Sequence, residues 1–161
     1  MCIRDSSYIK SKIIETDALL GGEMSGHIFF NDDWYGFDDA IYSALRIIEV
    51  ISKKNISSHK IFEKYPSLFS TPEINISVPD QIKFKLIDTL KIYIYSTKFK
   101  YIDIDGIRVE NKNAWGLVRA SNTSPNIVLR FEGETEKDLQ EIKNYFKTIL
   151  SKIDNNLNLS F

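Results

Sequence analysis

The sequence predicts a first domain that combines helices with strands, followed by an α+β domain in which helices cover one face of an antiparallel sheet. Residues 18–30 have the pattern strand, glycine-rich loop, strand, and a helical pattern follows. Residues 56–72 are rich in Ser, Thr and Pro, which is typical of a connecting segment. Beyond them, alternating apolar residues predict several strands between two helices. We therefore place a boundary near residue 72, which gives domains 1–72 and 73–161.

Two helices are predicted in the first domain. In residues 7–16, Ile9 and Ile13 fall on one helical face. A second helix follows Asp38 and Asp39, either of which can cap its N-terminus. Its apolar residues repeat at helical spacing, so we expect them to face a core. They are Ile41, Ala44, Leu45, Ile48 and Ile51.

The second domain begins with a strand over residues 73–78, where apolar and polar residues alternate. Pro79 and Asp80 end this strand and start a helix. The apolar residues in phase on that helix are Ile82, Leu86 and Leu90. Asp105 followed by Gly106 is a strong hairpin signal. The strands expected around and after it are 100–105, 107–110, 114–120 and 127–132.

The last helix is predicted from a capping box and an apolar stripe. Thr135 followed by Asp138 resembles a capping box, with Asp in place of the usual Glu. The stripe consists of Leu139, Ile142, Phe146, Ile149 and Ile153. Residues 154–161 are expected to form a loose tail.

Composition narrows the function classes. The 161 residues are 43% apolar and carry a formal net charge of −1, without a long basic run, so nucleic-acid binding has no electrostatic support. The lone Cys2 excludes an internal disulfide and offers no zinc site. The sequence has no apolar run long enough to span a membrane and no signal peptide at its start, so we expect a cytoplasmic protein without a membrane partner.

The first polar loop, residues 23–27, carries Glu23, Ser25 and His27 between glycines. A carboxylate can accept two hydrogen bonds from a vicinal diol, while the hydroxyl and the imidazole can donate or accept. This set suits a polyhydroxylated small molecule better than a metal ion, which would need more ligands. The alternative is a glycine-rich hairpin with incidental polar residues.

The second polar loop, residues 119–126, lies between two apolar strands. The guanidinium of Arg119 matches phosphate oxygens bidentately. Ser121, Asn122 and Thr123 add hydroxyl and amide donors, and backbone N–H groups in such a turn can form an anion nest. The alternative is a polar hairpin whose side chains cap their own backbone.

Both loops together resemble one enzyme family. Residues 22–27 (Gly-Glu-Met-Ser-Gly-His), followed by 34–39 (Trp-Tyr-Gly-Phe-Asp-Asp), resemble the third domain of the α-D-phosphohexomutases. Residues 119–125 (Arg-Ala-Ser-Asn-Thr-Ser-Pro), followed by 129–132 (Leu-Arg-Phe-Glu), resemble the phosphate loop of their fourth domain. The resemblance covers residues 7–153 and is greatest for the phosphomannomutase/phosphoglucomutase branch.

The resemblance implies transfer of phosphate between C1 and C6 of a hexose through a phosphoserine enzyme and a bisphosphate intermediate. Glu23 and Ser25 would bind sugar hydroxyls, with His27 nearby in the same site. The implied phosphate-binding residues are Arg119, Ser121, Asn122 and Thr123. Met24 at its position in the motif favours mannose or glucose phosphates over the phosphoglucosamine branch.

The resemblance also implies that this chain is the C-terminal part of a four-domain enzyme. Its first domain would then be an α/β partial domain, a mixed sheet with helices. The phosphoserine of the first domain and the Asp cluster of the second, which binds Mg²⁺, have no counterpart in this sequence. The expected partners are therefore a hexose phosphate and the missing N-terminal domains, and the chain alone should be inactive. Residues 1–6 lack the family's Gly-His and are expected to be the edge of a truncated reading frame. The alternatives are a non-catalytic sugar-phosphate-binding module and a phosphoglucosamine mutase.

Overall fold

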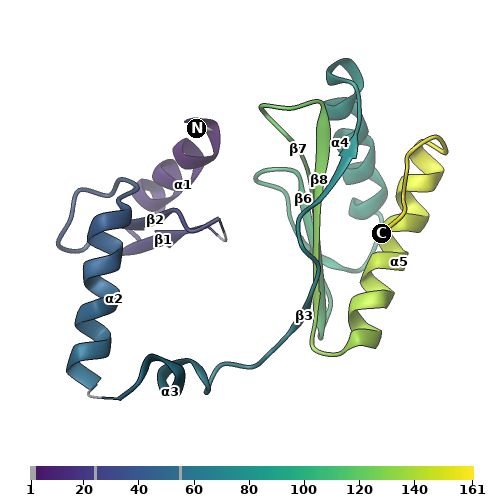
Figure 1. Cartoon of the computed structure of the whole chain (residues 1–161). Coiled ribbons are helices and arrows are strands. Elements are labelled where there is room, and N and C mark those ends of the chain that lie inside the picture. The colour runs from purple at the N-terminus through teal and green to yellow at the C-terminus, as the bar shows by residue number, and fades with distance from the viewer. Residues whose placement is uncertain (1–2, 24, 55) are drawn as a thin grey trace. The chain divides into compact units, whose positions relative to one another are not determined.

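A computed structural model describes residues 3–23, 25–54 and 56–161. The chain divides into two compact units, Met1–Pro66 and Ser67–Phe161, which are described separately (Figure 1). The division lies before the expected boundary near residue 72, because Phe69–Ser70 already forms a strand of the second unit.

Unit 1 contains three helices and one two-stranded hairpin among its described residues. Its elements are α1 (Ile3–Thr16), β1 (Leu20–Gly22), β2 (Ile28–Phe30), α2 (Ala40–Lys54) and α3 (Ser58–Phe62). The strand–loop–strand prediction is confirmed. α1 begins four residues earlier than predicted, and the segment expected to be only a connection contains α3.

The two longer helices of unit 1 that flank the hairpin cover its opposite faces. Gly21 lies against α1, since a Cβ at this position would come within 2.7 Å of Ile13 Cδ1. Phe30 projects to the other face, where it makes an edge contact with Tyr42 of α2 at 5.3 Å. The guanidinium of Arg46 stacks over the same Phe30 ring at 4.6 Å. The unit thus has a helix, sheet, helix layering.

The prediction that the apolar stripe of α2 faces a core is wrong. Ile41 is 77% exposed, Leu45 59% and Ile48 60%. The spacing of apolar residues indicates that α2 is amphipathic, but it does not indicate what covers the apolar face. In the described part of unit 1 only Ile13, Phe29 and Ile61 are buried apolar residues, so little of a core exists for α2 to pack on.

Unit 2 is a single antiparallel sheet covered by two helices. Its elements are β3 (Phe69–Ser70), β4 (Ile74–Ser77), α4 (Asp80–Tyr95), β5 (Lys100–Ile102), β6 (Ile107–Glu110), β7 (Ala114–Ala120), β8 (Asn126–Gly133) and α5 (Glu136–Ile153). The strand order is β3-β8-β7-β6-β5, and β4 also pairs with β8. Both helices lie on one face of the sheet, as predicted (Figure 1).

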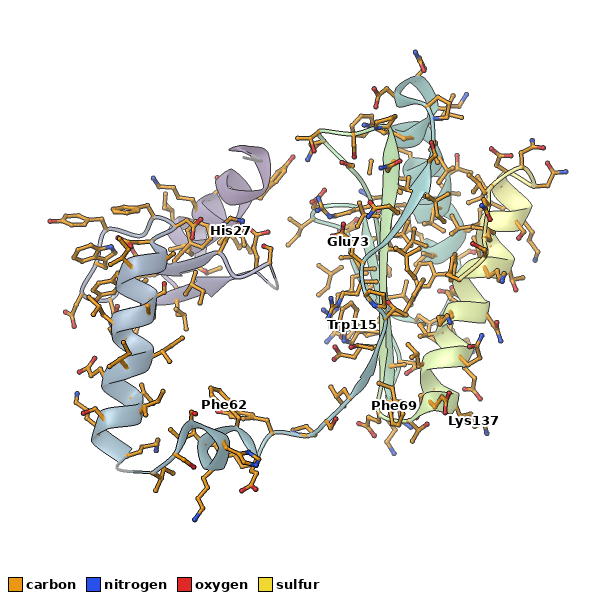
Figure 2. All side chains as sticks on the ribbon, in the orientation of Figure 1. His27, Phe62, Phe69, Glu73, Trp115 and Lys137 are labelled. Carbon is orange, nitrogen blue, oxygen red and sulfur yellow. The ribbon has the colours of Figure 1, made fainter. Side chains whose placement is uncertain are left out.

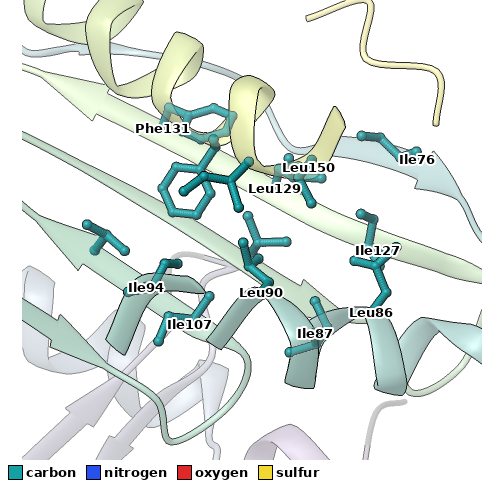
Figure 3. Packing of buried hydrophobic residues seen from close by; sticks show 14 of the residues in the cluster. Ile76, Leu86, Ile87, Leu90, Ile94, Ile107, Ile127, Leu129, Phe131 and Leu150 are labelled. Atoms are coloured by element: carbon teal, nitrogen blue, oxygen red, sulfur yellow. The ribbon is translucent and has the colours of Figure 1, made fainter. Parts of the chain in front are cut away.

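The core of unit 2 lies between this sheet face and the two helices (Figure 3). Leu86 and Leu90 are buried in it as predicted, but Ile82 is 43% exposed. The capping box at the start of α5 is confirmed, because Thr135 accepts from the Asp138 N–H and the Asp138 carboxylate accepts from the Thr135 N–H. The capped start of α5 and the continuous core make unit 2 a rigid support for its loops.

The C-terminal residues do not form the loose tail that was expected. The Phe161 ring stacks on Phe131, with centroids 5.3 Å apart. Lys147 Nζ donates to the Phe161 carbonyl at 3.2 Å. Leu157 and Leu159 also pack against the core, because their apolar side chains find an uncovered part of it.

Candidate functional site

The first polar loop connects β1 to β2 in a tight turn. The Glu23 N–H donates to the His27 carbonyl at 2.8 Å, and the Gly26 N–H donates to the Glu23 carbonyl at 3.0 Å. Gly26 has φ +91°, a value that glycine adopts without steric cost. The hairpin therefore brings Glu23, Ser25 and His27 together at one end of a two-stranded sheet. Met24 lies outside the described residues.

His27 has a carboxylate partner, Asp38, which the sequence indicated only as a possible cap of the following helix. Its Nδ1 lies 2.5 Å from Asp38 Oδ2, while Asp38 Oδ1 accepts from the Ile28 N–H at 3.2 Å. This hydrogen bond and the Asp38 charge raise the pKa of His27, and the Glu23 charge adds to the effect. Since Nδ1 is engaged and the side chain is 47% exposed, Nε2 is the nitrogen left to meet a ligand.

Glu23 presents a ready acceptor. Its Oε1 is buried, yet it has no hydrogen-bond partner within the part of the chain that the structure describes. A buried carboxylate oxygen without a donor is costly, so a ligand hydroxyl that donates to it would be favoured. Ser25 is exposed at the tip of the same loop. The first polar loop can therefore offer one acceptor and two groups that donate or accept.

The second polar loop connects β7 to β8 and is organised by Ser121. Only 7% of Ser121 is exposed, and its Oγ accepts from the backbone N–H of Ser124 at 3.2 Å and of Thr123 at 3.4 Å. The Ser124 hydroxyl also donates to it at 2.8 Å. Asn122 is half-buried and Thr123 is exposed at the loop tip. The loop is thus a preformed turn with its polar tip outward.

A buried lysine of α4, Lys83, holds this loop by a hydrogen bond, and the sequence did not predict this role. Lys83 of α4 is 3% exposed; its Nζ donates to the Ser124 carbonyl at 2.8 Å and forms an ion pair with Asp80 at 2.5 Å. Pro125 is fixed as well, since its carbonyl accepts from the Val78 N–H. The available signal was periodicity, because Lys83 falls on the same helical stripe as the buried residues of α4.

Arg119 is held at the end of β7 by the turn between β5 and β6. Its Nη1 lies 3.5 Å from Asp105 Oδ2, and its side chain is 24% exposed. Gly106 has φ +77°, and a Cβ there would lie 2.5 Å from Arg119 Cβ and 2.3 Å from the Val118 carbonyl oxygen. Glycine at 106 therefore permits the turn to approach Arg119 closely.

The sheet face around Arg119 is the one without helices. Residues alternate along β7, so Trp115 shares this face with Arg119. The Trp115 ring stacks with the Arg108 guanidinium at 4.1 Å, and its Nε1 donates to Glu132 at 3.2 Å (Figure 2). The face therefore presents charged and aromatic groups, in contrast with the apolar face under α4 and α5.

The described residues do not fit a metal ion. Across residues 3–23, 25–54 and 56–161, no group of three or more His, Cys, Asp or Glu side chains is arranged to hold one. In the same ranges, no helix is both long and apolar enough to cross a bilayer.

Comparison with protein families identifies both units. Residues 6–69 match the model described as phosphoglucomutase/phosphomannomutase, alpha/beta/alpha domain III. Residues 73–149 match the model of the phosphoglucomutase/phosphomannomutase C-terminal domain. The layers of unit 1 and the antiparallel sheet of unit 2 agree with these assignments.

Individual relatives agree with the family models. A phosphomannomutase/phosphoglucomutase of Pseudomonas putida is 50% identical over 155 residues, which are 96% of this chain and 34% of the relative. A phosphoglucomutase of Neisseria meningitidis serogroup A is 43% identical over 92% of this chain and 33% of its own length. A crystal structure of a family protein from Burkholderia thailandensis superposes with a TM-score of 0.81 at 38% identity, covering 97% of this chain and 33% of that one. The chain spans about a third of the length of these relatives and belongs to the phosphoglucomutase/phosphomannomutase family, of which it carries domain III and the C-terminal domain.

Proposed function

We propose that this chain is the C-terminal part of a phosphohexomutase that interconverts hexose 1-phosphate and hexose 6-phosphate, with mannose or glucose as the sugar. The reaction passes through a phosphoserine enzyme and a bisphosphate intermediate. The observation that supports this best is that each of the two units carries a preformed polar loop and matches a mutase domain. The names of the relatives favour a phosphomannomutase/phosphoglucomutase over a non-catalytic binding module or a phosphoglucosamine mutase.

In this proposal the first polar loop binds the sugar. Glu23 Oε1, which has no hydrogen-bond partner among the described residues, accepts from a sugar hydroxyl. Ser25 donates or accepts beside it, and His27 offers Nε2 while Asp38 holds Nδ1. Binding of this kind contributes by positioning the sugar for phosphoryl transfer.

The second polar loop binds the phosphate already on the sugar. Arg119 exchanges its contact with Asp105 for the phosphate oxygens, which match the guanidinium better. The residues proposed to complete the phosphate site are Ser121, Asn122 and Thr123. Because Ser121 and Lys83 already order the loop, little conformational entropy is lost when the anion binds.

The remaining chemistry belongs to domains outside this chain. A phosphoserine and a Mg²⁺ site in those domains would supply the transferable phosphoryl group and the charge stabilisation for its transfer. We also propose that the enzyme is cytoplasmic, as expected from the sequence. A coupled assay of the purified chain with mannose 1-phosphate and Mg²⁺ should show no turnover, and turnover would overturn the assignment of the catalytic groups to other domains.

The loop assignments can be tested in a chimaera in which this chain replaces the matching segment of the P. putida relative. A charge-assisted bidentate contact contributes roughly 1.5–3 kcal/mol, so Arg119→Ala should weaken glucose 6-phosphate binding about tenfold to a hundredfold in calorimetric titration. Arg119→Lys should recover only part of this loss. Glu23→Gln should alter discrimination between mannose and glucose phosphates and leave inorganic phosphate binding intact. Unchanged affinities in Arg119→Ala would show that the second polar loop is only a structural hairpin.

A further inference from the structure

The arginine of the second polar loop has a carboxylate beside it. Arg119 is the last but one residue of β7, and its Nη1 lies 3.5 Å from Asp105 Oδ2. Asp105 precedes Gly106 in the turn between β5 and β6, and Gly106 lies beside Arg119 because Ile107 pairs with Val118. The register of the sheet therefore places the carboxylate next to the guanidinium.

This contact is weaker than a well-matched arginine–carboxylate pair. In unit 1, Arg46 places Nη1 3.2 Å from Asp32 Oδ1 and Nη2 3.0 Å from Asp32 Oδ2, so two parallel hydrogen bonds form. The distance of 3.5 Å between Arg119 and Asp105 is long for a hydrogen bond, and the two side chains are 24% and 35% exposed. An ion pair of this kind contributes little to stability, because water competes for both charges. A stronger anion can therefore replace Asp105 at Arg119.

A phosphate ester is such an anion. It carries a charge of roughly −1.5 to −2 at pH 7 and three strong acceptor oxygens, whereas a carboxylate carries one charge and two oxygens. While Asp105 remains beside Arg119, its negative charge also repels an incoming phosphate. Asp105 therefore opposes phosphate binding in two ways, since it engages the guanidinium and repels the ligand.

We propose that Asp105 competes with the phosphorylated sugar for Arg119, and that it thereby lowers the affinity of the second polar loop and speeds release of the ligand. This inference rests on the proposed function, in which the loop binds the phosphate of substrate and product alike. Only molecules in which Arg119 has left Asp105 are competent to bind, so the apparent dissociation constant is the intrinsic one divided by that fraction. The contact benefits an enzyme, because binding substrate more tightly without binding the transition state more tightly does not accelerate turnover.

The test is phosphate affinity in the chimaera in which this chain replaces the matching segment of the P. putida relative. Asp105→Asn keeps the shape of the side chain and removes its charge. It should bind inorganic phosphate and glucose 6-phosphate about threefold to tenfold more tightly in calorimetric titration, because a partly exposed ion pair no longer competes. Asp105→Ser, a residue that also suits a turn, should tighten binding to a similar extent.

The sign of the effect decides between competition and a structural role. If Asp105 only held Arg119 in position, both variants would bind phosphate more weakly than wild type. Unchanged or weaker binding in both variants would therefore overturn the proposal.

Asp103→Asn is the matched control for charge. Asp103 lies two residues earlier in the chain, is exposed, and accepts from the Tyr95 hydroxyl at 2.5 Å. This variant removes one negative charge close to the turn but leaves the Asp105 carboxylate in place, so phosphate affinity should change by less than about twofold. In an Arg119→Ala background, Asp105→Asn should likewise have an effect below about twofold, because competition requires the guanidinium. An equal gain in Asp103→Asn, or an equal gain without Arg119, would overturn the proposal, since charge repulsion alone would then explain the result.

The same titrations distinguish failure of this inference from failure of the proposed function. If Arg119→Ala leaves phosphate affinity unchanged, the proposed phosphate site and the competition at it are both overturned. If Arg119→Ala weakens binding but Asp105→Asn does not strengthen it, the phosphate site stands and the role of Asp105 is refuted. Tighter binding in Asp105→Asn that requires Arg119 supports both.

Discussion

Replacing Gly106 by alanine should destabilise unit 2 and disturb Arg119. Its φ of +77° lies in the left-handed region, where a residue with a side chain costs roughly 1–2 kcal/mol. The new Cβ would also lie 2.3 Å from the Val118 carbonyl oxygen and 2.6 Å from Arg119 Cα, both backbone atoms that cannot rotate away. Overpacking of this kind adds about 1–3 kcal/mol. We expect a total loss of about 2–5 kcal/mol, or a fall in melting temperature of at least about 8 °C for a domain of this size.

Tryptophan fluorescence gives a clean assay, because the chain has two tryptophans and each unit contains one. In a Trp34→Phe background, only Trp115 reports the unfolding of unit 2. Gly26→Ala is the control: Gly26 has φ +91°, but apart from its chain neighbours no described residue has an atom within 4 Å of a Cβ at this position, and Gly26 belongs to unit 1. This variant should leave the Trp115 transition where it is. An unchanged midpoint in Gly106→Ala would refute the close approach of the turn to Arg119.

Three further predictions concern other contacts. In Asp38→Asn, the pKa of His27 measured by NMR titration should fall, because both main causes of its elevation are lost. In wild type this pair stabilises unit 1 at pH values below the ordinary pKa of 6.5, and the contribution is lost as pH rises through the raised pKa; the variant should lack that dependence. Thr135→Ala should cost about 1 kcal/mol of unfolding free energy in urea, with Thr135→Ser close to wild type; equal stability of all three would contradict a role for the cap. Phe161→Ala should lose up to about 3 kcal/mol, and an unaltered urea midpoint would mean that the ring contact with Phe131 is not formed in solution.

Local patterns were sufficient for much of the fold. Alternation predicted the strands of the sheet in unit 2 except β3, which lies in the segment expected to be a connection. The Asp105–Gly106 pair located a hairpin of this sheet, because such signals reflect geometry within a few residues. The capping box of α5 was found for the same reason. The two polar loops were also located, although their ligands stay a prediction.

Features that depend on distant contacts were missed. Asp38 could be read only as a helix cap, yet Asp39 caps α2 and Asp38 binds His27, which is eleven residues earlier. The role of Lys83 depends on a carbonyl 41 residues away. The tail was read as loose because Phe161 finds its partner thirty residues back in the chain. Sequence periodicity contains no information on which surface such groups will meet.

The burial of Lys83 makes this residue a chemical reporter of the second polar loop. Amine acylation requires a solvated, deprotonated Nζ, and this one is enclosed and hydrogen-bonded to the Ser124 carbonyl. Its rate of labelling would therefore follow the rate at which the loop lifts from α4, while exposed lysines such as Lys112 need no such opening to react. Any anion that holds the loop closed should slow the modification of Lys83 selectively.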